Sequence, residues 1–155
     1  MVSCPINAPA SFTRGAKYQR LVEGAWVVRR KRWYYLFYSV DNCCGAKAHY
    51  GIMVARSRKA TGPFETLATA TGAPNSVIVE QRGRWLAPGH NSVIKDAAGG
   101  HWLLYHAVDA RQSRDKASDE VNSRRVMLLD RVHWRDGWPR VVGGEPSAAR
   151  QRTPR

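Results

Sequence analysis

The sequence predicts an all-β protein made of short antiparallel strands that are arranged as blades of a β-propeller. No window of the 155 residues keeps apolar residues at helical spacing for three turns, whereas short runs rich in β-branched and aromatic residues recur between turn residues. A group of strands is also followed by a second group with the same outline, which is typical of propeller blades. A β-sandwich would give short strands too, but it would not predict this match.

The first four strands are expected between residues 25 and 81. "AWVVRR" and "WYYLFYS" are rich in Trp, Val and Tyr and flank a short basic turn, so they should form a hairpin. "YGIMVARS" follows the loop "DNCCGAKA", and "SVIVEQ" follows the turn "ATGPF". The expected ranges are 25–30, 33–39, 50–57 and 76–81.

The second four strands repeat this plan. "NSVIKD" and "HWLLYHA" flank the turn "DAAGG", "RRVMLLDRV" follows a polar loop at 109–123, and "PRVV" comes last. The expected ranges are 91–96, 101–107, 124–132 and 139–142. The folded domain should cover 18–143, between a poorly ordered extension (1–17) and a disordered basic tail (144–155).

The repeat relates two polar residues of different kinds. His90 stands 67 residues after Glu23, and Trp102 stands 69 residues after Trp33. In a propeller the innermost strand of each blade borders the central channel, and Glu23 and His90 head equivalent strands. We therefore expect both side chains to point into one funnel. The run Ala25–Val27 should give Glu23 an apolar wall that disfavours its charged form.

Charge and cysteine content limit the other classes. The net charge is +13, but the 25 Lys and Arg residues are scattered, so a nucleic-acid binder is the least favoured reading. No apolar run approaches a membrane span, and the first residues lack the features of a secretory signal as they stand. Cys4 and the pair Cys43–Cys44 form no disulfide framework and no zinc site, and the pair is expected to serve loop packing.

Seven motifs in a fixed order resemble a known family. They are E-G-x-W, Y-L-F-Y-S, C-C-G, A-R-S-x-x-x-x-G-P-F, P-G-H-N-S-V, Y-H-A and D-G-W-P. Together they resemble the C-terminal part of a glycoside hydrolase family 43 catalytic domain, in its arabinanase, arabinosidase and β-xylosidase group. The resemblance implies a five-bladed β-propeller, of which this chain would form about two to three four-stranded blades.

The resemblance also implies an activity and its residues. It implies hydrolysis of O-glycosyl bonds with inversion, in arabinan- or xylan-type polysaccharides, by two carboxyl groups on either side of the bond. Glu23 matches the general acid. His90 matches a histidine associated with a metal, usually calcium, through water, because calcium itself prefers oxygen ligands. Substrate contacts are expected from Trp85, Asn91 and His106.

One departure from the family bears on this expectation. The family's general base and its second Asp lie upstream of the acid, and the 22 residues before Glu23 contain no Asp. The chain is therefore expected to be a truncated form, associating through open sheet edges with a missing N-terminal half or with itself. A catalytically inactive sugar-binding or structural fragment is the alternative.

Overall fold

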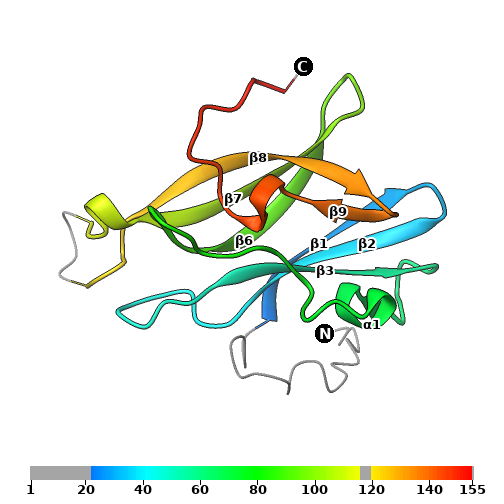
Figure 1. The fold of residues 1–155 in the computed structure, drawn as a ribbon, viewed down its shortest axis with the longest axis horizontal. Coiled ribbons are helices and arrows are strands. Elements are labelled where there is room, and N and C mark those ends of the chain that lie inside the picture. The colour runs from blue at the N-terminus through cyan, green and yellow to red at the C-terminus, as the bar shows by residue number, and fades with distance from the viewer. Residues whose placement is uncertain (1–21, 116–119, 155) are drawn as a thin grey trace.

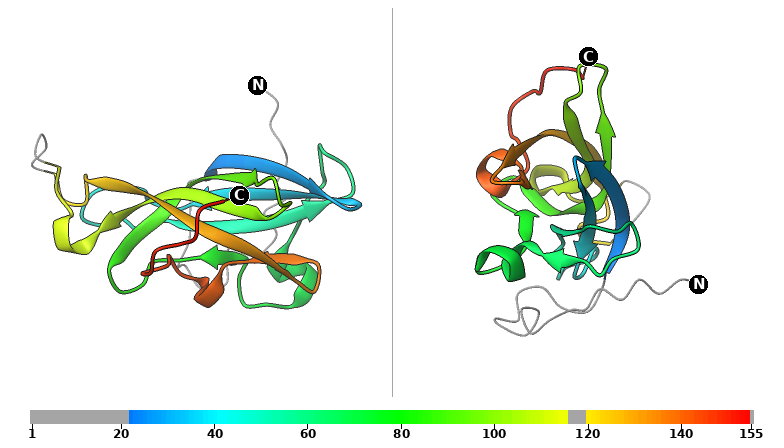
Figure 2. Two further views of the ribbon diagram at one scale, coloured as in Figure 1. Left: turned by 90° about the horizontal axis from the view of Figure 1, so that it is seen from above. Right: turned by 90° about the vertical axis from the view of Figure 1, so that its right-hand side faces the viewer.

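The computed structural model describes residues 22–115 and 120–154, which form two antiparallel sheets facing each other (Figures 1 and 2). The first sheet has the strand order β1-β2-β3-β4, with β5 paired to β3, and the second has the order β6-β7-β8-β9. The predicted all-β blades are confirmed, because each sheet contains four strands in chain order, to which the first sheet adds β5 as a fifth strand. The first-sheet strands are β1 (Val22–Arg30), β2 (Trp33–Val40), β3 (Gly51–Ser57), β4 (Glu65–Thr66) and β5 (Val77–Val79). The second-sheet strands are β6 (Trp85–Lys95), β7 (His101–Asp109), β8 (Arg125–Arg135) and β9 (Trp138–Arg140). The expected extension at 1–17 lies outside the described residues.

The strand β6 begins six residues earlier than the sequence predicts. It pairs with β7 through two irregularities, one between Leu86 and Gly89 and one between Gly89 and Ser92. Bulges of this kind let extra residues enter a strand without losing the pairing on either side. Pro88 therefore fits inside a strand, although a proline normally argues against one.

A short helix, α1 (Leu67–Thr71), was not predicted. Five residues are too few to show a helical period, and the helix is marked by its ends instead. The Thr66 side chain accepts a hydrogen bond from the Thr69 N–H, and the Gly72 N–H donates to the Ala68 carbonyl. No helix in the described ranges is long and apolar enough to cross a membrane.

The strand β2 is buried on both faces. Tyr35 and Phe37 belong to the main core between the two sheets, together with Leu103 and Tyr105 of β7. The alternate β2 residues enter a second cluster on the other face of the first sheet, whose members are Leu36, Tyr38, Val40, Met53, Ala55 and Phe64. This explains why "WYYLFYS" is apolar at nearly every position, as in strands covered on both sides.

The prediction of a disordered tail from residue 144 differs from the structure. The Ser147 N–H donates to the buried Asp130 carboxylate at 3.2 Å, and the Glu80 N–H donates to the Gly144 carbonyl at 2.9 Å. Figure 2 shows the C-terminal segment running beside the second sheet. The composition of the tail did not reveal these contacts because they use backbone groups, which every residue carries.

Arg56 joins the two sheets at the end of β3. Its guanidinium carbon lies 4.2 Å from the ring centroid of Trp33 in the first sheet and 4.2 Å from that of Trp138 in the second. Its Nε donates to the Glu65 carboxylate at 2.7 Å. Two aromatic contacts and one ion pair therefore converge on a single side chain that bridges the blades.

We expect Arg56→Met to lower the free energy of unfolding by about 2 kcal/mol. The methionine keeps an apolar chain between the rings, but both cation–π contacts are lost and Glu65 loses its partner. Urea denaturation measures the change. Arg29→Met is the matched control, because exposed Arg29 lies 5.8 Å from the Tyr34 ring and its loss should cost under about 0.5 kcal/mol. Equal costs for the two variants would contradict the bridging role.

Candidate active site

The candidate site lies where β1 begins, at the end of the sheets opposite the β1–β2 turn (Figure 1). Glu23 pairs with Ser39 at the end of β2, and Tyr50 directly precedes β3. His90 lies in the irregular part of β6, which runs beside β1. Two strand ends of one blade and a bulge of the next therefore bring these side chains together.

Glu23 is held by a tyrosine and a histidine. The Tyr50 hydroxyl donates a short hydrogen bond to Glu23 Oε1, and His90 Nδ1 lies 3.8 Å from the same oxygen. Burial and the bond to Glu23 raise the pKa of Tyr50 above its ordinary value of 10, so the phenol remains a hydrogen-bond donor. The carboxylate itself is one-third exposed, at 34 %, and can be reached from solvent.

The backbone at this point is shaped so that β1 and β6 can approach each other. Gly24 has φ +60°, and a Cβ there would lie 3.1 Å from the His90 Cα, so a side chain would force the strands apart. His90 itself adopts φ +54°, which is uncommon for a residue other than glycine and costs backbone strain. Such strain is concentrated at functional sites in many proteins.

Ser39 fixes the β6 segment against the first blade. Its hydroxyl oxygen accepts from the His90 N–H at 2.8 Å and donates to Asn91 Oδ1 at 3.0 Å. Ser39 and Asn91 are both buried, and Asn91 Nδ2 has no hydrogen-bond partner among the described residues. Ser39 and Tyr50 were not recognised as site residues in the sequence. Their signal was positional, because both stand at the strand ends that flank the loop next to Glu23.

His106 of β7 lies in a row of rings with Tyr50 and His90. Its ring is stacked on both, with centroid separations of 6.3 Å and 6.0 Å. Its Nδ1 lies 2.9 Å from an Arg125 guanidinium nitrogen, which can act only as a hydrogen-bond donor. Burial, with the charges of Arg125 and His90, lowers the pKa of His106 to about 4, so the ring is neutral and accepts the bond near neutral pH.

This pKa predicts a loss of stability in acid. Between its ordinary value of 6.5 and about 4, the unfolded chain binds a proton at His106 that the folded chain does not. Folding stability therefore falls as the pH is lowered through that window, by on the order of 2 kcal/mol, and the loss is complete below it. Urea unfolding at pH 7 and pH 4 measures it. His106→Gln should show a smaller difference between the two pH values, and an unchanged difference would contradict the assignment.

The structure brings four of the predicted site residues together and leaves one apart. Glu23, His90, Asn91 and His106 are joined by the contacts above. Trp85 is buried, at 8 % exposed, and lines a different pocket with Arg82, Asp130 and Glu145, so the described residues do not bring it to Glu23. A buried first residue of a bulged strand could not be distinguished in the sequence from an exposed one.

The apolar wall expected beside Glu23 is also absent within the described ranges. Trp26 and Val27 are 43 % and 47 % exposed, and Ala25 is exposed as well. They lie on β1, which pairs on one side only, with β2. The expectation failed because an apolar side chain forms a wall only when another element packs against it.

The loop between β2 and β3 contacts the second blade at this end. It carries a disulfide between Cys43 and Cys44, and Arg125 Nη2 lies 3.9 Å from the Cys44 sulfur. Asn122 Nδ2 donates to the Gly45 carbonyl at 3.0 Å. These contacts agree with the expected packing role of the cysteines. Arg125, which holds His106 and reaches the loop, was not recognised in the sequence.

The described residues do not form a calcium cage. No group of three or more His, Cys, Asp or Glu side chains within 22–115 and 120–154 is placed to hold a metal. Near His90 there is one carboxylate, Glu23, and calcium needs six to eight oxygen ligands. A cation at His90 would depend on water and on oxygen atoms from outside these residues.

Comparison with known proteins adds a family to this geometry. The model of "Glycosyl hydrolases family 43" matches residues 7–139. A probable arabinan endo-1,5-α-L-arabinosidase A of Aspergillus clavatus is 30 % identical over 154 residues, covering 88 % of this chain and 46 % of that protein. An extracellular exo-α-(1→5)-L-arabinofuranosidase of Cellvibrio japonicus is 30 % identical over 124 residues, covering 77 % and 33 %. The chain thus spans about half the length, or less, of these curated relatives.

Solved structures agree with the sequence matches. The α-L-arabinanase of Cellvibrio cellulosa in complex with arabinohexaose superposes with a TM-score of 0.64 at 28 % identity, covering 77 % of this chain and 36 % of that one. A thermostable family-43 glycoside hydrolase superposes with a TM-score of 0.66 at 27 % identity, covering 86 % and 38 %. The two sheets therefore correspond to part of the β-propeller that such proteins form.

Proposed function

The chain belongs to glycoside hydrolase family 43, and on this basis we propose that it forms part of an inverting glycosidase that cleaves α-L-arabinosyl linkages in arabinan. The observation that carries the proposal is the placement of Glu23, a partly exposed carboxylate at the meeting point of two blades, held by Tyr50 and next to His90. The two curated relatives described above are named as an arabinosidase and an arabinofuranosidase, which favours arabinose over xylose as the sugar.

Glu23 acts as the general acid in this proposal. Inversion needs one carboxyl group that protonates the leaving oxygen and a second that activates water on the opposite face of the sugar. The Tyr50 hydroxyl and the His90 ring hold the Glu23 carboxyl at the meeting point of the two blades. Asn91 keeps the expected substrate role in this proposal, supported by its place next to His90 and by an Nδ2 that has no hydrogen-bond partner among the described residues.

The general base must come from elsewhere. Within the described residues, the contacts of Glu23, Tyr50, His90 and His106 include no second carboxylate. Residues 1–21 contain no acidic side chain. We propose that the base is supplied by residues beyond this sequence, on a segment that packs against the exposed β1 residues Trp26 and Val27. Calcium bridged by water to His90 belongs to the same proposal, since its oxygen ligands would also come from that segment.

The proposal is tested by supplying the chain with a segment that carries a general base. The chain is mixed with, or joined to, the N-terminal portion of the Aspergillus clavatus relative that this chain does not match. Release of sugar from debranched arabinan is then followed by reducing-end assay. Proton NMR identifies the anomer of the newly formed reducing end. We expect product only from the combined protein and initially in the β configuration, because inversion of an α-linkage gives the β-anomer. Product of α configuration, or inactivity of every soluble combination, would contradict the proposal.

A sugar-binding role without catalysis is the second candidate, and the lone carboxylate of the described site favours it. Titration of the isolated chain with arabino-oligosaccharides distinguishes the two. Binding without turnover, unchanged on addition of the N-terminal portion, would favour this candidate.

A further inference from the structure

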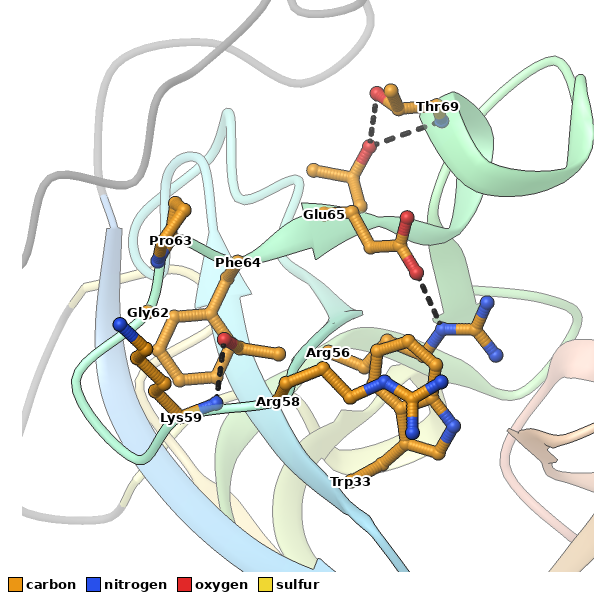
Figure 3. A pocket seen from close by; sticks show the side chains of 11 residues that line it. Trp33, Arg56, Arg58, Lys59, Gly62, Pro63, Phe64, Glu65 and Thr69 are labelled. Atoms are coloured by element: carbon orange, nitrogen blue, oxygen red, sulfur yellow. Dashed lines mark hydrogen bonds and ion pairs between the residues drawn. The ribbon is translucent and has the colours of Figure 1, made fainter.

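A pocket, shown from close by in Figure 3, lies at the opposite end of the first sheet from Glu23, as the strand register shows. Its volume is about 520 Å³, and it is formed by the start of β2, the end of β3, β4 and the turn between β3 and β4. On β2, Ser39 pairs with Glu23 of the candidate active site, and Trp33, which lines the pocket, pairs with Arg30 at the other end of the hairpin. The pocket therefore lies six residues along β2 from the candidate active site. That separation is roughly 20 Å. The pocket is therefore a separate site of the size that holds small ligands.

The walls of the pocket are mainly apolar. Phe64, which is buried, lies under the turn formed by Gly62 and Pro63, and Trp33 also lines the pocket (Figure 3). Such walls suit a ligand that presents C–H groups rather than a fully hydrated ion. A sugar ring, with polar edges and an apolar face, meets this requirement.

The pocket carries two cations that no carboxylate neutralises within the described ranges. Its one acidic residue, Glu65, is paired with Arg56 at 2.7 Å. Arg58 and Lys59 are both exposed, and neither forms an ion pair with another described residue. The Arg58 guanidinium carbon lies 3.8 Å from the Trp33 ring centroid. This cation–π contact restrains a side chain whose planar set of donors matches a planar anion.

We propose that this pocket binds a uronic-acid unit of an acidic polysaccharide, with the carboxylate on Arg58 and Lys59 and the ring against Phe64 and Pro63. A uronic acid presents one carboxylate beside the apolar face of its ring, and the pocket presents two cations beside an apolar wall, so the two are complementary. A nucleic acid would instead need a row of cations to meet successive phosphates. The choice of a polysaccharide rests on the proposed function. A site that holds a neighbouring anionic chain raises the effective concentration of the neutral chain to be cleaved.

Calorimetric titration of the full chain with tri-galacturonate tests the proposal. We expect binding that weakens at least tenfold in the double variant Arg58→Ala/Lys59→Ala. The matched control is Arg150→Ala/Arg152→Ala, which removes the same two charges from exposed residues outside the pocket and should change the affinity less than twofold. Thermal unfolding confirms that both variants fold. Glu23→Gln should bind tri-galacturonate with the same affinity as the unchanged chain. The binding test is therefore independent of whether the proposed hydrolase activity is found.

Three results would overturn the proposal. Equal weakening in the control would mean that the net charge, rather than the pocket, attracts the ligand. Equal binding of the methyl-esterified trisaccharide would remove the role of the carboxylate. Displacement of tri-galacturonate by inorganic phosphate or by a single-stranded oligonucleotide at the same concentration would make the pocket a general anion site.

Discussion

Replacing Glu23 by Gln is expected to lower kcat on arabinan by at least about two to four orders of magnitude in the combined protein described above. The amide can still accept the Tyr50 hydrogen bond, so the geometry of the site is kept. Its N–H protons are not acidic, so it cannot protonate the leaving oxygen. KM should change little, because the lost interaction is made in the transition state.

The leaving group supplies the decisive comparison. In a nitrophenyl arabinoside the leaving group is nitrophenolate, a stable anion that needs little protonation. Glu23→Gln should therefore lower kcat far less on this substrate than on arabinan. The alkaline limb of the pH profile of kcat/KM should also disappear in the variant. Glu145→Gln, at a carboxylate paired with Arg82 in a different pocket, is the control and should keep full activity. Equal losses on both substrates would make Glu23 a structural residue.

The sequence was sufficient to predict the blades because their signal is repeated. Eight short apolar runs with turns between them leave few arrangements, and the correspondence of Glu23 with His90 predicted that the two would meet. The structure places them 3.8 Å apart. This prediction depended only on topology, because the innermost strands of adjacent blades lie side by side whatever their detailed pairing.

The partners of Glu23 could not be predicted in the same way. Tyr50 reaches Glu23 across 27 positions of sequence and Ser39 reaches His90 across 51, through bulges whose positions the sequence pattern does not reveal. The burial of Trp85 could not be predicted for a related reason, because burial at the first residue of a bulged strand depends on what packs over it. The pattern of residues thus fixes which strands meet, and the irregularities decide which side chains touch.

Replacing Gly89 by Ala is expected to cost about 3 kcal/mol or more of unfolding free energy, the largest effect of a single methyl group in this site. A Cβ at this position would lie 1.9 Å from Tyr50 Cδ1 and 2.1 Å from Cε1. Tyr50 is fully buried and its hydroxyl donates to Glu23, so the ring cannot move aside without breaking that bond. Urea denaturation measures the cost.

A second glycine serves as a control that distinguishes the cost of this clash from the cost of backbone strain. Gly83 has φ +57°, and a Cβ there would meet no atom within 4 Å, so Gly83→Ala should cost only about 1 kcal/mol. In a Tyr50→Ala background, Gly89→Ala should cost at least about 1 kcal/mol less than it does alone, because the clashing ring is gone. If the two glycine variants cost the same, or if the background makes no difference, then Gly89 does not hold Tyr50 against the acid. The expected result instead makes the glycine of "PGHNSV" a positioning residue, since it leaves room for the ring that orients Glu23.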